Sequence, residues 1–193
     1  MTLQAQEGKQ IKVQSDRTIK DQNRFPGATI LAKVDKQVYM EHEGIEIWCD
    51  QAIHYGEDRF VIALGIVIIK HGDTHTLTSI YAEYNGVTQF AYASDNVYME
   101  TPSNTLQSDT LFFDRLRQQA YYRSGGTVKD SSNTLTSKIG RYFMDRKQYS
   151  FNTNVKIVNP ENTVDSDRLD YYTENGHAYL YGPSTVKGIE STL

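Results

Sequence analysis

The sequence has few of the residues and segments that commonly fix a protein's compartment. It contains one cysteine, Cys49, so it cannot form an intramolecular disulfide bond, and cysteine usage does not identify the compartment. Its longest apolar run, residues 60–69, is about half the roughly 18 residues that a transmembrane helix needs. The first ten residues contain no apolar core of a secretory signal peptide. The protein is therefore either cytosolic, or a signal peptide has been removed and replaced by Met1.

The sequence also has no strong excess of either charge. Lys and Arg number 20 against 24 Asp and Glu, a net charge of −4, with a pI near 5.7. Without a basic field, nucleic acid is not an expected partner. A hydrophobic content of 38% and a charged content of 23% are typical of a globular protein. The length suits one domain with a sizeable core.

Motifs of enzyme chemistry are missing as well. The sequence has no nucleophile elbow, phosphate-binding loop, zinc-protease helix or dinucleotide fingerprint. The segment 71–75, His-Gly-Asp-Thr-His, is its only His/Asp cluster, and a metal site there would need a third ligand from elsewhere. We expect this segment to form a solvated hairpin turn. Neither a metal nor a cofactor is expected.

What the sequence does have is an internal repeat with a period of about 29 residues. Four serines recur at this constant spacing, and each is preceded two positions earlier by Leu or Val and followed five positions later by an aromatic residue. An apolar residue stands twenty positions after each serine. The four serines are Ser79, Ser108, Ser137 and Ser166. With one inserted residue the pattern extends upstream, so repetition covers roughly residues 28–190.

Each repeat predicts two antiparallel strands. Val97 and Met99 alternate with Tyr98 and Glu100, and residues 155–158 show the same period with Val155 and Ile157 against Lys156 and Val158. This is the period of a half-buried strand. After the serine, the apolar positions shift from Leu106 to Leu111 and Phe113, a change of phase that a β-bulge would produce. No stretch keeps a helical stripe. Turns are expected at Asn85-Gly86, at Asn175-Gly176 and at residues 71–73.

The predicted fold is therefore all-β and built from repeats, with about eleven or more strands. A flat sheet of that size would expose one apolar face, so the sheet must fold over on itself, as a jelly roll, an open double sheet or a solenoid. Residues 1–25 are predicted to be a polar tail or an edge strand. Residues 26–193 are predicted to be a single domain.

The repeat also explains residues that could otherwise suggest catalysis. Cys49 replaces the repeat serine, so we expect a small buried residue rather than a reactive thiol. Asp109 and Asp167 both follow repeat serines, as Asp50 follows Cys49. Two carboxylates could serve glycoside hydrolysis, but recurrence at the repeat period favours a role in a turn or bulge.

The phased segments resemble a known family. Residues 106–113, Leu-x-Ser-Asp-x-Leu-x-Phe, and 164–171, Val-x-Ser-Asp-x-Leu-x-Tyr, resemble the repeating unit of the OstA-like (LptA-like) proteins. The elements that follow, residues 63–67 and 93–97, resemble the family's next motif, with Asn96 where glycine is usual. Residues 155–160 and 182–184 suggest the branch found in Bacteroidetes.

The resemblance implies a non-enzymatic periplasmic or outer-membrane-associated β-jelly-roll that forms part of a bridge for lipopolysaccharide. Acyl chains would slide along an apolar groove between the sheets. The edge strands at the two ends of the protein would pair with a second copy of the protein or with other jelly-roll transport proteins. The resemblance also implies that Met1 replaces a removed signal peptide and that the natural chain can continue past Leu193. The predicted lipid-contacting positions are the in-phase apolar residues Leu77, Tyr84, Met99, Leu106, Leu111, Phe113, Val128, Leu135, Tyr142, Ile157, Val164, Leu169, Tyr171 and Val186.

Three alternatives stay open at this point. The in-phase residues could fill a dry core instead of lining a groove. The protein could be a glycan- or protein-binding β-scaffold that uses its 14 tyrosines. It could also be a hydrolase that uses Asp109 and Asp167.

Overall fold

The computed structural model describes residues 9–188 and shows an all-β protein with seventeen strands. The strands are β1 (Lys12–Gln14), β2 (Arg17–Ile19), β3 (Thr29–Ala32), β4 (Val38–His42), β5 (Ile45–Cys49), β6 (Gln51–Tyr55), β7 (Phe60–His71), β8 (His75–Asn85), β9 (Phe90–Glu100), β10 (Thr105–Asp114), β11 (Gln119–Tyr122), β12 (Gly126–Lys129), β13 (Thr134–Ser137), β14 (Ile139–Phe143), β15 (Gln148–Val158), β16 (Asn162–Tyr172) and β17 (His177–Gly188). Every pairing between them is antiparallel, and residues 9–188 contain no helix. The expected all-β class is confirmed.

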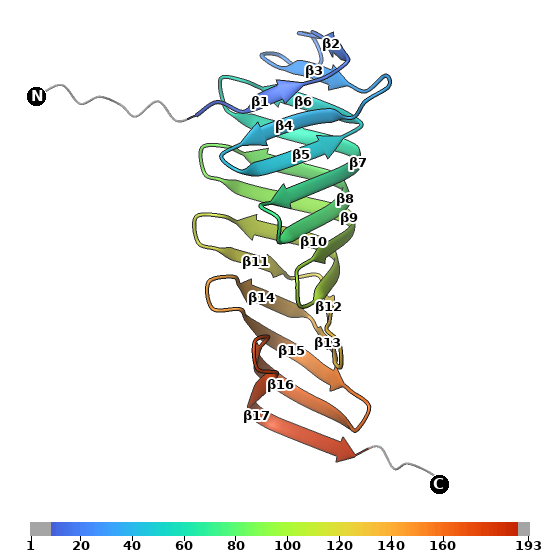
Figure 1. The fold of residues 1–193 in the computed structure, drawn as a ribbon, viewed down its shortest axis with the longest axis vertical. Coiled ribbons are helices and arrows are strands. Elements are labelled where there is room, and N and C mark those ends of the chain that lie inside the picture. Colours follow the sequence, from blue (N-terminus) through green and yellow to red (C-terminus); the bar gives the residue numbers. More distant parts are fainter. Residues whose placement is uncertain (1–8, 189–193) are drawn as a thin grey trace, which may run out of the picture.

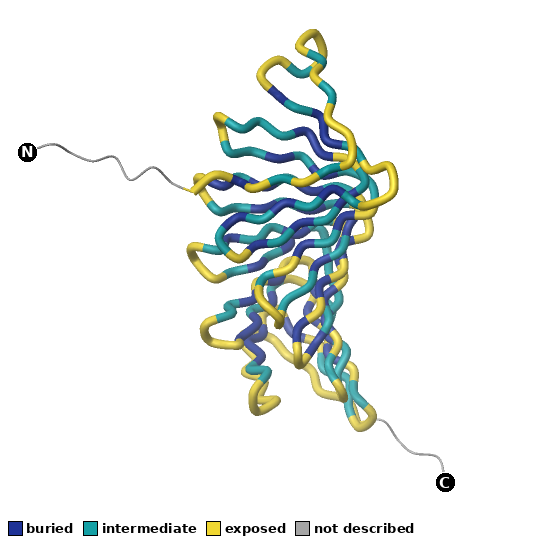
Figure 2. Tube along the Cα trace, turned by 45° about the horizontal axis from the view of Figure 1, so that its top comes forward, coloured by how far each residue is buried: buried dark blue, intermediate teal, exposed yellow. Residues whose placement is uncertain are grey.

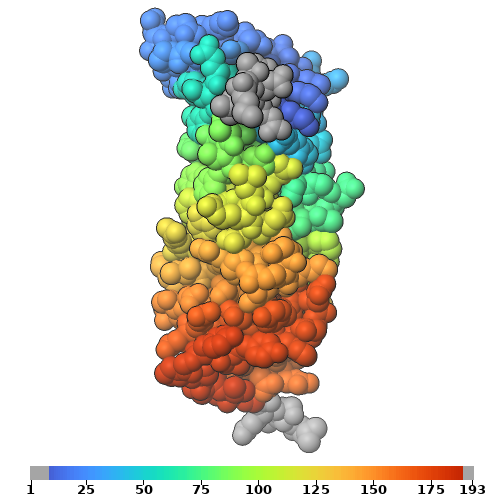
Figure 3. Space-filling view, turned by 90° about the vertical axis from the view of Figure 1, so that its left-hand side faces the viewer, coloured from blue at the N-terminus to red at the C-terminus, as the bar shows by residue number. Residues whose placement is uncertain are grey.

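The strands stack in chain order into a long column (Figure 1). The space-filling view shows the colours following one another down this column, because each repeat lies on the one before it (Figure 3). Of the segment predicted as a tail or edge strand, residues 12–14 pair with β4 and residues 17–19 pair with β3. Residues 1–8 and 189–193 lie outside the described part of the chain.

The column is one continuous sheet that folds over at the middle of each repeat. Sheet I is the layer formed by β2, β3, β6, β11, β14 and residues 60–64, 81–85, 90–94, 110–114, 148–152, 168–172 and 177–181. Sheet II is the layer formed by β1, β4, β5, β12, β13 and residues 67–71, 75–79, 97–100, 105–108, 155–158, 162–166 and 184–188. The long strands cross from one sheet to the other, as the predicted folded-over double sheet requires.

The fold-over occurs where the ladder slips, which confirms the predicted bulges. The β9–β10 register shifts between Ser108 and Thr110, and the β15–β16 and β16–β17 registers shift at the matching places. The backbone has positive φ on one side of each bend, at a single glycine (Gly65, Gly125 and Gly182) or at two consecutive residues (Asp95-Asn96 and Thr153-Asn154). Glycine and asparagine tolerate this conformation best, so Asn96 takes the glycine position at limited cost.

The repeat serines complete the bends. The hydroxyl groups of Ser79, Ser137 and Ser166 donate to the carbonyl oxygens two residues later, at 2.9–3.0 Å, and Ser108 donates to the Gly125 carbonyl at 2.7 Å. All four serines are buried. A carbonyl freed from the ladder needs such a donor where water is excluded, which gives a physical reason for the serine that recurs in these four repeats. The preceding repeat has Cys49 at this position.

Candidate functional site: the interior between the two sheets

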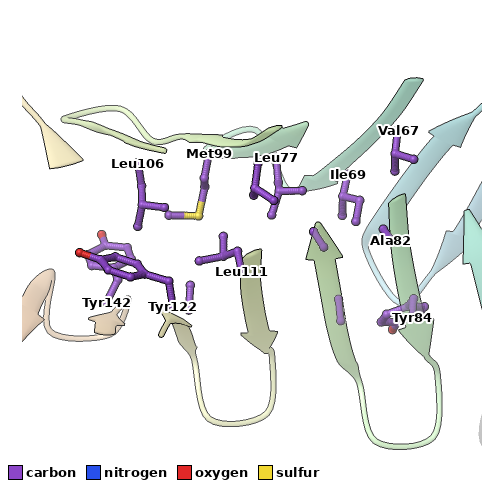
Figure 4. Close-up of a cluster of buried hydrophobic side chains, with 14 of the residues drawn as sticks. Val67, Ile69, Leu77, Ala82, Tyr84, Met99, Leu106, Leu111, Tyr122 and Tyr142 are labelled. Carbon is purple, nitrogen blue, oxygen red and sulfur yellow. The ribbon is translucent and has the colours of Figure 1, made fainter. Parts of the chain in front are cut away.

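The candidate site is the space between sheet I and sheet II, which runs through the column. Side chains from the two sheets face each other across it in two rows (Figure 4). The sheet II row is continuous because its members pair directly across strands: Leu77 with Met99, Met99 with Leu106, Leu106 with Val128, Val128 with Leu135, Leu135 with Ile157, Ile157 with Val164, and Val164 with Val186. Period-two alternation keeps every member on the same face.

The predicted positions divide by burial. Eleven of the fourteen are buried in this interior: Leu77, Tyr84, Met99, Leu106, Leu111, Val128, Leu135, Tyr142, Ile157, Leu169 and Tyr171. Phe113 and Val164 are partly buried and pack against the same core. Val186 is 63% exposed. Its strand pairs only with β16 within residues 9–188, so no further layer covers it (Figure 2). Contact of these residues with lipid stays a prediction.

In the upper part of the interior, between residues 60 and 113, sheet I presents small side chains. Ala63, Ala82, Ala91 and Ala93 are buried there opposite larger residues of sheet II. They leave a cavity of about 30 Å³. Its lining is apolar apart from Thr76 and two histidines and consists of Ile45, Ile69, His71, His75, Thr76, Leu77, Ala91, Ala93, Met99, Leu111 and Phe113. Since about 10–15 Å³ of such space accommodates one water molecule, the cavity has room for a few methyl-sized groups, and the side chains around it are otherwise largely buried.

In the lower part of the interior, between residues 120 and 171, aromatic rings fill the space between the sheets. The rings of Tyr142 and Tyr149 stack with centroids 4.4 Å apart, and Phe151 stacks on Tyr149 at 5.4 Å. Tyr122 lies over two glycines, Gly126 and Gly140, where an added methyl group would overlap its ring. Tyr122, Tyr149 and Phe151 were not among the predicted positions. Their alternation with outward residues is the signal that could have found them.

The edges of the two sheets meet along a seam, which is held by hydrogen bonds between tyrosines of sheet I and residues at the strand ends and turns of sheet II. The Tyr84 hydroxyl lies 2.8 Å from His42 Nδ1, and the Tyr149 hydroxyl donates to Asn104 Oδ1 at 2.6 Å. The Tyr171 hydroxyl donates to the Asp130 carboxylate. We call these three contacts the latches. Burial and the Asp130 contact raise the pKa of Tyr171 to about 12, so this latch persists throughout the neutral range.

One seam segment has no latch, and there the prediction of a solvated turn was wrong in part. Residues 72–74 are exposed, but the His71 and His75 rings turn toward sheet I. His71 meets the edge of Phe113 at 5.8 Å between centroids, and His75 lies 6.5 Å from Tyr142. Burial lowers the pKa of both histidines, with a smaller contribution from neighbouring positive charge. We call the four residues His71, His75, Phe113 and Tyr142 the ring gap.

The residues that could suggest catalysis, Cys49, Asp109 and Asp167, do not form a catalytic arrangement. Cys49 is fully buried, and burial raises the pKa of its thiol to about 12, so it is not a thiolate near neutral pH. Asp109 and Asp167 are exposed at the bends. Within residues 9–188, no three His, Cys, Asp or Glu side chains lie close enough together to hold a metal ion.

The outer face of sheet I carries a second group of rings. Phe112 stacks on Tyr121 at 5.0 Å, and the guanidinium groups of Arg123 and Arg141 lie over the Tyr121 ring at 5.4 and 5.3 Å. Tyr92 approaches Phe112 at 5.2 Å. Because these rings cover one another, they offer little free face for stacking on a sugar. This arrangement favours the simpler interpretation, in which outward aromatics stabilise a sheet.

Comparison with known protein families identifies the family of this chain. The OstA-like protein family matches residues 9–167. The chain belongs to the OstA-like family. This family is a non-enzymatic transport family, in agreement with the expectation that the chain is not an enzyme. A search of the curated proteins finds no match.

Among solved structures, the chain is similar to LptH from Pseudomonas aeruginosa, described as the LptA-homologous periplasmic component of the conserved lipopolysaccharide transport device. The TM-score is 0.54 at 11% sequence identity, and the match covers 61% of this chain and 95% of LptH. At this identity the likeness establishes the fold, which is the predicted LptA-like β-jelly-roll. In residues 9–188 there is no helix that could span a membrane.

Proposed function

We propose that this OstA-like protein carries lipopolysaccharide in the periplasm, with the acyl chains held between sheets I and II. The observation that carries the proposal is the sheet II row, an uninterrupted line of apolar side chains from Leu77 to Val186. A row of similar sites would let an apolar chain move along the column. The family and the fold shared with a lipopolysaccharide transport component support the same cargo.

Because the interior is almost filled, cargo must separate the two sheets locally. The seam contacts are few, and a hydrogen bond contributes about 1 kcal/mol to stability. Burying an acyl chain contributes roughly 0.8 kcal/mol per methylene group. A chain of a dozen carbons therefore gains on the order of 10 kcal/mol, which exceeds the cost of opening a latch or two. The alternative of a permanently dry core predicts no such exchange.

Cross-linking within the sheet II row tests the cargo and its location together. A photoreactive amino acid at Leu135 or Ile157 should cross-link to lipopolysaccharide in cells that produce it. The matched controls are Thr136, which follows Leu135, and Lys156, which precedes Ile157. Their side chains point outward from the same strands. Cross-links of equal strength at Leu135 and Thr136, or none at any position, would contradict the proposal.

The C-terminal end of the column offers a surface for continuing the row into another molecule. β17 is twelve residues long, is exposed throughout, and pairs only with β16 within the described residues. Its Leu180 and Val186 continue the interior rows but lie 37% and 63% exposed. Long apolar edge strands readily add a further strand. The proposed partner is a second copy or another jelly-roll transport protein.

Self-association tests this pairing. Sedimentation of the purified chain should show assemblies that grow with concentration, and the double variant Leu180→Lys/Val186→Lys should shift them to monomers. Tyr179→Lys is the control, since Tyr179 lies on the outer face of the same strand, 53% exposed. A wild-type chain that stays monomeric at high concentration would refute end-to-end pairing and leave the cargo proposal standing.

A further inference from the structure

The ring gap occupies a place where the repeat elsewhere builds a latch. Phe113 takes the position of Tyr84 one repeat later, and His71 takes the position of His42 one repeat later. Tyr84 and His42 are joined by a hydrogen bond of 2.8 Å, but Phe113 has no hydroxyl group to offer His71. The same pair of positions is thus latched in one repeat and unlatched in the next.

The whole β7–β8 turn, residues 71–75, lacks a latch to sheet I. Among residues 9–188, no hydrogen bond joins residues 71–75 to sheet I, and none joins the Tyr142 hydroxyl to another side chain or to the backbone. His75 Nε2 is buried without a partner, although its Nδ1 contacts Thr74 at 2.8 Å. On either side of the gap the seam is held again, by Arg115 bound to Glu43 above and by Asn104 bound to Tyr149 below.

The cavity lies directly behind this gap. His71, His75 and Phe113 form part of both, and the cavity continues inward to Leu77, Met99 and other apolar side chains. A methylene group placed in this apolar cavity would gain contacts with the side chains that line it. The unlatched segment and the spare room in the interior therefore coincide.

We infer that the ring gap is the entry site through which a single acyl chain first passes between the sheets. This inference rests on the proposed lipid cargo. Opening the seam here breaks ring contacts but no hydrogen bond, whereas opening it at Tyr84, Tyr149 or Tyr171 breaks at least one. The first methylene groups to enter would fill the existing cavity before the sheets separate further.

The substitution Phe113→Tyr tests the inference by restoring the missing latch. Pyrene-labelled hexadecanoic acid is mixed with the wild-type protein and the variant, and its uptake is followed by stopped-flow fluorescence. We expect uptake about fivefold slower in the variant, the rate factor that corresponds to one added hydrogen bond, with similar binding at equilibrium. Tyr84→Phe is the matched control, because it opens a second gap and should not slow uptake. Unchanged uptake in a Phe113→Tyr variant of raised thermal stability would overturn the inference.

A second measurement does not depend on whether the new hydrogen bond forms. A photoreactive amino acid is placed at position 113 in one protein and at position 171 in another, and each is flashed at increasing times after mixing with lipopolysaccharide. Cross-links should appear first at 113. Equal or earlier cross-linking at 171 would overturn the entry site while the proposed function stands. Absence of cross-links at both positions, together with no lipid binding, would instead refute the proposed function.

Discussion

The upper and lower parts of the interior have the same backbone plan and opposite contents. Between residues 60 and 113, sheet I presents four buried alanines, and a cavity remains beside Ala91 and Ala93. Between residues 120 and 171, it presents Tyr122, Tyr149 and Phe151, all with no exposed surface. The repeat therefore fixes where side chains point, whereas their volume decides whether the space is filled or can admit a guest.

The largest effect is expected from emptying the lower part. Tyr122→Ala removes a fully buried ring and its 2.7 Å hydrogen bond to Ser137. Truncations of large buried aromatic residues typically cost about 3–5 kcal/mol, so we expect a loss of about 4 kcal/mol in the free energy of unfolding. Urea denaturation measures it. A loss below about 1 kcal/mol would mean that the lower interior is not tightly packed.

The glycines beneath that ring give the next effect. Gly140→Ala would place a methyl group against the Tyr122 ring, and overpacking of this kind costs about 1–3 kcal/mol. Gly56→Ala is the control, because the nearest atom to its added methyl group is His54 Cε1 at an ordinary 3.6 Å. Thermal unfolding of the two variants compares them. Equal melting temperatures would show that Tyr122 moves aside freely.

Removing the hydroxyl of Tyr149 tests the seam in the lower part. Tyr149→Phe leaves the buried Asn104 Oδ1 without its donor, which should lower the free energy of unfolding by about 1–2 kcal/mol. In the ring gap, Tyr142→Phe removes a hydroxyl that has no partner within residues 9–188 and should change stability by less than about 0.5 kcal/mol. Chemical denaturation distinguishes the two. A larger loss for Tyr142→Phe would contradict the assignment of the gap.

The smallest effect should come from enlarging a side chain beside the cavity. Ala93→Val adds two methyl-sized groups where about 30 Å³ is free, so we expect a cost below about 1 kcal/mol. The same change at Ala120, which has no exposed surface and does not line the cavity, should cost about 1–3 kcal/mol. If both variants lose equal stability, the upper part is as tightly packed as the lower.

The repeat phase was enough to predict the strands, the bulges and most of the inward residues. It was enough because period-two alternation and a constant repeat spacing leave each phased position only one face. It could not predict the exposure of Val186, since burial there depends on a layer beyond β17 that the described residues lack. The inward turn of His71 and His75 was missed, although both continue the alternation of Ile69 and Leu77 across the hairpin.

The sequence alone determined the all-β class and the folded-over plan, because repetition and alternation act locally and act on every copy alike. The expectation of a non-enzymatic protein came from the resemblance of the phased segments to the OstA-like family. Only the tertiary structure decided which edges meet along the seam. Tyr84 is hydrogen-bonded to His42, and Tyr171 is hydrogen-bonded to Asp130, although the partners lie far apart in the sequence. A single missing hydroxyl at Phe113 becomes a gap only when the fold places His71 opposite it. Contacts between non-neighbouring strands depend on how far the sheet curls, and no local pattern records that curvature.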